Sequence, residues 1–179
     1  MHEPISDEVL ERAKQVRLMI FDVDGVLTDG TLYVSDTGTE MKAFNVRDGH
    51  GLKILKESGV EVALLSARRS RTVELRAAEL GIALVEQGAA DKGAAFGRLL
   101  EGCGLTSAAA GYMGDDLADL SVLVRCGFAA SVPEAPGAVR RRVHYVTGTG
   151  GGRGAAREVC ELIMHAQNTL ERTIARSLA

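Results

Sequence analysis

The 179-residue sequence contains no tryptophan, and aromatic residues make up only 4% of it. Aromatic platforms on which bases or sugars stack would therefore have few members. Basic residues are not in excess either, because the formal net charge is -3. A chain of this charge has little capacity to neutralise a nucleic-acid backbone, so we expect no nucleic-acid partner.

Cysteine is also scarce. The spacings of Cys103, Cys126 and Cys160 match no zinc site, and their odd number fits no closed disulfide framework. No apolar run approaches the roughly 18 residues that a membrane span requires. The N-terminal residues lack the basic flank and apolar stretch of a signal peptide. These absences favour a reduced, cytoplasmic location without a membrane partner.

Short apolar segments alternate with helical patterns along the chain, as is typical of parallel strands covered on both faces. The apolar segments are 16–21, 60–65, 82–85, 108–113, 127–130 and 144–146. Helices are expected over 49–58, 70–80, 91–101, 117–124 and 153–177. With no repeat and no second core, residues 1–179 are expected to form a single α/β domain built on a doubly wound parallel sheet.

Two segments depart from this alternation. In residues 31–44, alternating side chains flank a turn at 35–39 that contains Gly38, which predicts a β-hairpin covering a site or forming a subunit contact. Residues 147–153 form the only glycine-rich loop, and we expect its glycines to let the C-terminal segment move. Deletion of the residues after Gly150 is then expected to raise KM or slow product release.

The motif Asp22-Val-Asp24-Gly25 directly follows the first apolar segment. Ligands of open α/β sheets bind beyond the carboxyl ends of the strands, which is where both carboxylates would lie. Two carboxylates held close together repel each other, so a cation or a shared proton is expected between them. Taken alone, the pattern also fits a solvated acidic loop.

A second acidic cluster, Asp115, Asp116 and Asp119, follows the fourth apolar segment. Its composition suits a hard cation with oxygen ligands, although Asp115 or Asp116 could instead cap a helix. Ser66 follows the second apolar segment and could hold a phosphate oxygen or form a simple turn. Lys92, at an expected helix start, could balance a bound anion or could be an ordinary surface lysine.

Together these residues resemble the four motifs of the haloacid dehalogenase-like superfamily, in the same order along the chain. More narrowly, residues 24–30, 44–51, 91–92, 114–117 and 151–160 resemble the family of 3-deoxy-D-manno-octulosonate 8-phosphate phosphatases. The resemblance covers nearly the whole chain. It implies a Rossmann-like fold with a hairpin insertion, no cap domain and a homotetramer assembled by the hairpin. The sequence departs from the family pattern at Ala67, where glycine is usual, and at Lys53, where arginine is more frequent.

The resemblance implies hydrolysis of 3-deoxy-D-manno-octulosonate 8-phosphate, in lipopolysaccharide precursor biosynthesis, through an aspartyl-phosphate on Asp22. It implies that Asp24 is the acid and base, and that Ser66 and Lys92 bind the phosphate. Mg²⁺ would be held by Asp22, by the backbone carbonyl of Asp24 and by Asp115. Asp116 would orient Lys92 or a metal-bound water. The residues implied or placed for substrate binding are Asp24, Asn45, Val46, Arg47, Asp48, Gly49, Lys53, Arg68, Arg76 and Lys92.

Three other functions remain open at this point. A related phosphatase would act on a 9-carbon sialic-type sugar acid 9-phosphate with the same motifs. A phospho-acceptor regulatory domain would also have an acidic metal site and a lysine, but its phosphorylated form would last for minutes instead of turning over. A purely structural subunit would not need the full set of Asp22, Asp24, Ser66, Lys92 and Asp115.

Overall fold

The computed structural model describes residues 5–178. Its centre is a six-stranded parallel sheet with the order β5-β4-β1-β6-β7-β8. The strands are β1 Leu18–Phe21, β4 Glu61–Ser66, β5 Leu84–Gln87, β6 Ala110–Met113, β7 Phe128–Ser131 and β8 Tyr145–Val146. Each overlaps one of the apolar segments of the sequence, so the predicted parallel α/β sheet is confirmed.

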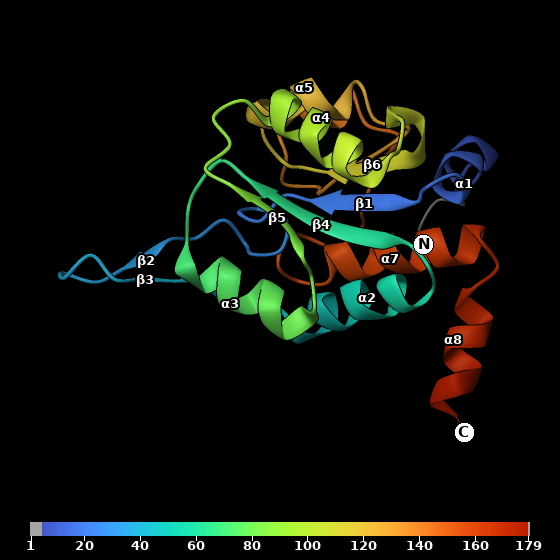
Figure 1. The fold of residues 1–179 in the computed structure, drawn as a ribbon, viewed down its shortest axis with the longest axis horizontal. Coiled ribbons are helices and arrows are strands. Elements are labelled where there is room, and N and C mark those ends of the chain that lie inside the picture. The colour runs from blue at the N-terminus through green and yellow to red at the C-terminus, as the bar shows by residue number, and fades with distance from the viewer. Residues whose placement is uncertain (1–4, 179) are drawn as a thin grey trace.

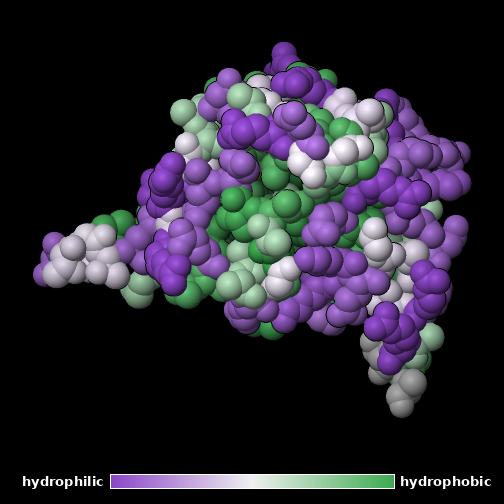
Figure 2. All heavy atoms as spheres, in the orientation of Figure 1, coloured by the Kyte–Doolittle hydropathy of each residue, from purple (hydrophilic) through white to green (hydrophobic). Residues whose placement is uncertain are grey.

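Helices cover both faces of the sheet (Figure 1). On one face lie α2 (Val46–Glu57), α3 (Arg71–Leu80) and α7 (Ala155–Ala166), and on the other lie α4 (Lys92–Cys103) and α5 (Leu120–Leu123). The fully buried strand β1 lies at the centre of this sandwich. In Figure 2, apolar residues are visible over the β5 edge, between the two helix layers.

The sequence did not predict every short element. Helices α1 (Asp7–Lys14) and α6 (Gly137–Arg140) and the 3-10 turn η1 (Ser107–Ala109) were not expected. The helix expected over 117–124 begins as the 3-10 turn η2 (Leu117–Asp119) before it continues into α5. Such short elements carry too few apolar positions for a helical period to be recognised.

The expected hairpin is present but short. Its strands, β2 (Tyr33–Val34) and β3 (Glu40–Met41), pair antiparallel, and it projects from the body of the protein (Figure 1). Exposed apolar side chains line it, with Val34 and Met41 each 62% exposed. Between β1 and α2 the chain makes only this hairpin and connecting loops, and residues 5–178 contain no cap domain.

The prediction of a single C-terminal helix over 153–177 is wrong, because the chain forms two helices, α7 and α8 (Leu170–Ser177), with a break between them. Asn168 adopts a left-handed conformation with φ 56°, which asparagine tolerates better than most residues. The side chain of Gln167 donates to the carbonyl oxygen of Val16 at 2.8 Å, which ties the break to the body of the protein. Helix α8 therefore leaves the body in a new direction (Figure 1).

Candidate active site

The strand order of the sheet changes direction between the neighbouring strands β1 and β6. From β1 the sheet grows through β4 to β5 on one side and through β6 to β8 on the other. At such a switch point, the loops after the two central strands separate and leave a crevice at the carboxyl edge. Asp22 follows β1 and Asp115 follows β6, so the two acidic motifs flank this crevice.

A hollow of about 170 Å³ opens at this edge. Among its lining residues are five that the sequence predicted for catalysis or metal binding: Asp22, Asp24, Ser66, Lys92 and Asp115. Arg68, Asp116 and Asp119 also line it. The tertiary structure thus brings together residues that are up to 97 positions apart in the sequence.

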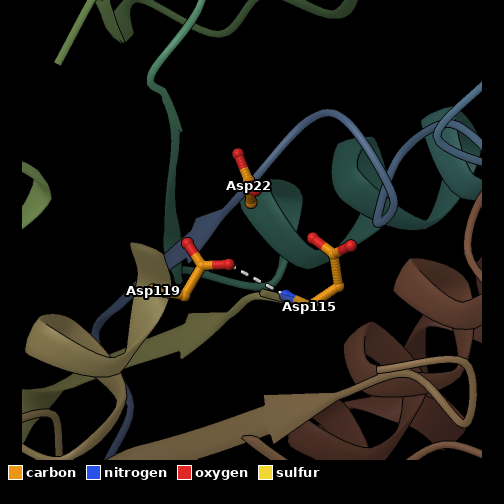
Figure 3. Close-up of side chains that lie close together, drawn as sticks. All are labelled: Asp22, Asp115 and Asp119. Carbon is orange, nitrogen blue, oxygen red and sulfur yellow. Dashed lines mark hydrogen bonds between the residues drawn. The ribbon is translucent and has the colours of Figure 1, made fainter. Parts of the chain in front are cut away.

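Three carboxylates form the acidic centre of the hollow. Asp22, Asp115 and Asp119 each offer one oxygen within 4.8 Å of the others (Figure 3). Gly25 lies against the carboxylate of Asp115, where a Cβ would overlap that carboxylate, and its φ of 87° also requires glycine. The first motif therefore supplies both a carboxylate and the space for the second motif to approach.

Burial makes the charge on these carboxylates unfavourable. Burial, with the negative charge of Asp119 next in size, raises the pKa of Asp22 to about 7. The same two causes raise the pKa of Asp115 to about 7. A divalent cation bound by oxygen ligands would relieve both effects, because it favours the ionised carboxylates. The donor set therefore fits Mg²⁺.

Lys92 is buried in the centre of this cluster. Its Nζ lies 2.9 Å from Oδ2 of Asp22 and 2.6 Å from Oδ1 of Asp119. Burial opposes the positive charge, but the two carboxylates outweigh that effect and raise the pKa of Lys92. The ammonium therefore stays charged beside the carboxylate of Asp22, where an anionic substrate group would bind.

Asp119 is the partner of Lys92 that the sequence analysis missed. Its Oδ1 also accepts from the hydroxyl of Tyr112 at 2.6 Å. Its Oδ2 accepts from the backbone N–H of Asp115 at 3.0 Å (Figure 3) and from that of Asp116, also at 3.0 Å. With both oxygens engaged in this way, Asp119 is better placed to hold Lys92 and the β6–η2 loop than to bind a metal.

The expectation that Asp116 orients Lys92 is therefore wrong. Asp116 is exposed, and its carboxylate accepts from the N–H of Leu117 at 2.7 Å, so it caps η2. Its role toward a metal-bound water stays a prediction. The sequence did contain a signal for this arrangement. Asp119 lies three residues after Asp116, which is the spacing of a capping box, and in a capping box the second acid accepts from the backbone N–H of the first.

Ser66 ends β4 inside the hollow and is 3% exposed. Its Oγ accepts from the backbone N–H of Arg68 at 3.2 Å, so it also forms the turn that was the alternative interpretation. Ala67 adopts no positive φ; among the non-glycine residues of 5–178 only Asn168 does. Alanine therefore fits this loop without backbone strain, although the related family usually has glycine there.

Asp24 points away from the acidic centre, toward the hairpin. Its Oδ1 accepts a hydrogen bond from Lys42, whose side chain is only 1% exposed. On the other side, Nε of Arg68 lies 3.8 Å from Oδ2. Glu40 pairs with both cations, at 3.3 Å from Lys42 and 2.6 Å from Arg68. The sequence analysis did not identify Lys42 or Glu40.

Most of the other residues expected to bind substrate lie outside the hollow in this chain. Val46, Arg47 and Lys53 are exposed, and Lys53 lines a separate hollow between α2 and α3. Arg76 pairs with Glu79 at 2.9 Å and lies over the ring of Phe44. Of the expected substrate residues, the structure places Asp24, Arg68 and Lys92 in the hollow.

Asn45, Asp48 and Gly49 have structural contacts at the start of α2. Asn45 caps α2 by accepting from the N–H of Arg47 at 2.8 Å. The buried carboxylate of Asp48 accepts from the N–H groups of Gly154 at 3.1 Å and Arg157 at 2.9 Å. Asp48 thus places a negative charge at the N-terminus of α7, where the helix dipole favours it. Asp48 does not line the hollow, and its expected contact with the substrate stays a prediction.

The glycine-rich loop packs against the turn after β1 in this structure, and the expected movement of the C-terminal segment stays a prediction. The N–H of Gly152 donates to the carbonyl of Val26 at 2.8 Å, and its carbonyl accepts from Asn45 at 3.2 Å. A Cβ on Gly151 or Gly152 would overlap the backbone at Gly25 or Thr28. These glycines therefore allow close packing of the loop against the turn that carries Asp24.

This packing also changes the expected effect of truncation. Helix α7 buries seven residues in the core, from Ala155 to Met164. Deletion after Gly150 would therefore remove a helix that covers the sheet, and loss of folding is the expected result in place of a kinetic change.

The fold and the hollow define a haloacid dehalogenase-like phosphatase. The carboxylate pair after the first strand, the serine after the second and the buried lysine meet a third carboxylate at the switch point of a parallel sheet. Such a site can provide a nucleophile, bind a cation and stabilise the charge of a phosphoryl group.

Known proteins define the family more narrowly. The 3-deoxy-D-manno-octulosonate 8-phosphate phosphatase KdsC of Yersinia pestis is 45% identical over 168 residues, which are 94% of this chain and 90% of that protein. KdsC of Escherichia coli (strain K12) is 43% identical over 175 residues, which are 98% of this chain and 93% of that protein.

A solved structure is similarly close. The Moraxella catarrhalis 3-deoxy-D-manno-octulosonate 8-phosphate phosphatase, in complex with magnesium ion, phosphate ion and KDO molecule, has a TM-score of 0.93 at 44% identity, over 95% of this chain and 98% of that one. No family model matches the chain. With these relatives along almost its full length, the chain belongs to the family of 3-deoxy-D-manno-octulosonate 8-phosphate phosphatases. In residues 5–178, no helix has both the length and the apolar character to cross a membrane.

Proposed function

We propose that this protein hydrolyses 3-deoxy-D-manno-octulosonate 8-phosphate to the free sugar acid and inorganic phosphate. The observation that carries the proposal is the setting of Asp22, which lies at the end of the central strand with Lys92 at 2.9 Å and two further carboxylates close by. The relatives described above bear the name of this activity, and one of them was solved with phosphate and the sugar acid.

In the proposed reaction, the carboxylate of Asp22 attacks phosphorus and the bond from phosphorus to the sugar oxygen breaks. Asp24 donates a proton to that leaving oxygen. A water then attacks the aspartyl-phosphate, Asp24 takes its proton, and phosphate is released with Asp22 restored. Ser66 and Lys92 hold the phosphate oxygens, where they stabilise the charge that develops during transfer.

Mg²⁺ is the proposed cofactor, held by Asp22, the backbone carbonyl of Asp24 and Asp115. When bound, it offsets the repulsion between the carboxylate and the phosphate. The raised pKa values of Asp22 and Asp115 support this assignment, because both carboxylates gain most from a neighbouring cation.

Substrate selection is proposed to fall to Arg68 first. It lies in the hollow and its side chain is 47% exposed, so it can turn to meet the carboxylate of a sugar acid. Arg47 and Arg76 face other surfaces in this chain and are proposed to act only if a neighbouring subunit brings them to a site. The C-terminal segment is proposed to reach such a neighbouring site as well.

Assembly into a homotetramer through the hairpin is part of the proposal. The hairpin projects from the body of the protein, and within residues 5–178 it leaves four apolar side chains exposed: Leu32, Tyr33, Val34 and Met41. Replacement of Val34 and Met41 by lysine should shift the protein toward smaller species in light scattering. An unchanged mass would exclude the hairpin as the interface.

A cytoplasmic location and a place in lipopolysaccharide precursor biosynthesis complete the proposal.

The test is phosphate release from a panel of sugar phosphates with Mg²⁺. We expect the highest kcat/KM for the 8-carbon sugar acid 8-phosphate. A preference for a 9-carbon sialic-type 9-phosphate would instead favour the related phosphatase. No release from any ester, together with a phosphorylated form that lasts for minutes, would favour the phospho-acceptor regulator.

A further inference from the structure

The carboxylate of Asp24 has an asymmetric environment. Among residues 5–178 it receives one hydrogen bond from a side chain, donated by the ammonium of Lys42 to Oδ1. For its other oxygen, Oδ2, the nearest cationic side chain in the described part of the chain is the more distant Arg68, at 3.8 Å. The two oxygens of the proposed acid and base are therefore not equivalent.

The two cations also differ in how firmly they are held. The side chain of Lys42 is 1% exposed and that of Arg68 is 47% exposed. Glu40 holds the ammonium of Lys42 from a second side, at 3.3 Å. Lys42 is thus fixed between two carboxylates, whereas Arg68 retains access to solvent and to a ligand.

Lys42 lies immediately after strand β3 of the hairpin, while Asp24 lies in the loop after β1. The ion pair therefore connects the hairpin to the site across 18 positions of sequence. A buried pair of this kind contributes little net stability on average, because desolvation offsets much of the attraction. Stability alone is a weak reason for a buried lysine at this place.

We propose that Lys42 is a positioning residue for Asp24, and this inference rests on the proposed function. Because Lys42 donates to Oδ1, a proton on Asp24 must lie on Oδ2. Lys42 thus holds the carboxyl group with Oδ2 as the oxygen that gives its proton to the leaving sugar oxygen and later takes one from water. Proton transfer requires such an oxygen within hydrogen-bond reach of the reacting atom.

The inference predicts a dependence on the leaving group. An alkyl leaving group such as a sugar hydroxyl needs a proton, whereas p-nitrophenolate leaves without one. In Lys42→Met, kcat/KM for the sugar phosphate should fall by about 10-fold or more, since misplacement of a catalytic group by about 1 Å can cost that much. For p-nitrophenyl phosphate, kcat/KM should change by less than about 3-fold. This parameter reports only the steps up to phosphorylation of Asp22, and with this leaving group those steps need no proton from Asp24.

A double-mutant cycle with Asp24→Asn separates positioning from other roles. If Lys42 acts through Asp24, adding Lys42→Met to Asp24→Asn should cause no further loss in sugar phosphate turnover, within about 2-fold. Equal losses for both esters, or losses that add fully to those of Asp24→Asn, would overturn the inference. The first result would indicate a structural role and the second a direct contact with the sugar.

Matched variants keep the test decisive. Lys14→Met removes an exposed lysine from α1 and should leave both kcat/KM values unchanged. If Lys42→Met does not fold, Lys42→Gln removes the charge and allows the same comparison of leaving groups. A ratio of the two kcat/KM values equal to that of the wild-type protein would overturn the inference. Failure of the wild-type protein to hydrolyse the sugar phosphate would contradict the proposed function, and any other alkyl phosphate that it hydrolyses then serves to test Lys42.

Discussion

The ammonium of Lys92 lies 2.6 Å from Oδ1 of Asp119, a residue 27 positions further along the chain. This pair links the start of α4 to the turn after β6, and it places the positive charge of Lys92 beside Asp22. Since Asp119 also accepts from the N–H groups of Asp115 and Asp116, one carboxylate organises both Lys92, the proposed phosphate ligand, and the loop of the second acidic motif.

Replacement of Asp119 by asparagine should therefore impair catalysis. The new amide group would face donors on both sides, namely Lys92 and the backbone N–H groups, so one contact must be lost. We expect kcat to fall by about 10- to 100-fold, as for the loss of a partner that orients a residue of the site. Steady-state phosphate release measures the effect. A larger loss in Asp116→Asn than in Asp119→Asn would reverse this assignment of the two acids.

Replacement of Asp22 by asparagine should abolish turnover. An amide cannot form the acyl-phosphate, and the other carboxylates of the hollow are assigned to the metal, to Lys92 and to proton transfer, so kcat should fall by on the order of 1000-fold or more. Thermal unfolding of the variant serves as the control, because a cooperative transition shows that the fold persists. Near-normal kcat on any phosphate ester would remove Asp22 from the role of nucleophile.

Removal of the metal should stop activity, and added Mg²⁺ should restore it. A ligand that binds only the folded state raises the melting temperature, so Mg²⁺ should also stabilise the wild-type protein against heat. In Asp115→Asn this stabilisation should be much smaller, because the variant loses one carboxylate ligand. Activity that is indifferent to a chelator, or equal stabilisation of both proteins by Mg²⁺, would contradict the metal site.

Glu158 should make stability depend on pH. It accepts hydrogen bonds from Thr149, Gly148 and Tyr145, the shortest at 2.7 Å. Burial alone would raise the pKa of Glu158, but these hydrogen bonds outweigh it and lower the pKa below 4.5. The stabilisation is therefore present above the unfolded pKa and is lost as pH falls through the folded pKa.

Urea unfolding of Glu158→Gln measures this contribution. Near pH 7 the variant should be less stable by about 1 kcal/mol or more, because its amide meets donors that the carboxylate accepted from. The difference from the wild-type protein should shrink when the pH falls below about 4.5, as the glutamate itself becomes protonated. A difference that grows on acidification would contradict a lowered pKa of Glu158 in the folded protein.

The sequence predicted much of the fold because its signals are local. Each of the six strands overlaps a short apolar run, and the four inner strands β4, β1, β6 and β7 are buried almost throughout, as helices on both faces require. The positions of Asp22, Ser66 and Asp115 relative to these runs follow directly, since a parallel sheet brings the ends of its strands to one edge.

The missed features are those that depend on contacts distant in sequence. The break at Asn168 follows from a left-handed residue and from Gln167 reaching α1, and a helical period shows neither. The packing of Gly151 and Gly152 depends on the backbone at Gly25 and Thr28, more than 120 positions away. From composition alone, such glycines suggest freedom of movement; against a neighbouring backbone they provide close contact.

The sequence by itself determined the parallel sheet, the acidic motifs at strand ends and the class of chemistry that these residues support. Only the tertiary structure decided which acid holds Lys92, that Asp48 secures α7, and that Lys42 reaches Asp24 from the hairpin. The reason is physical: a strand or a helix turn is specified by neighbouring residues, whereas the partner of a buried charge is specified by whichever distant element packs against it.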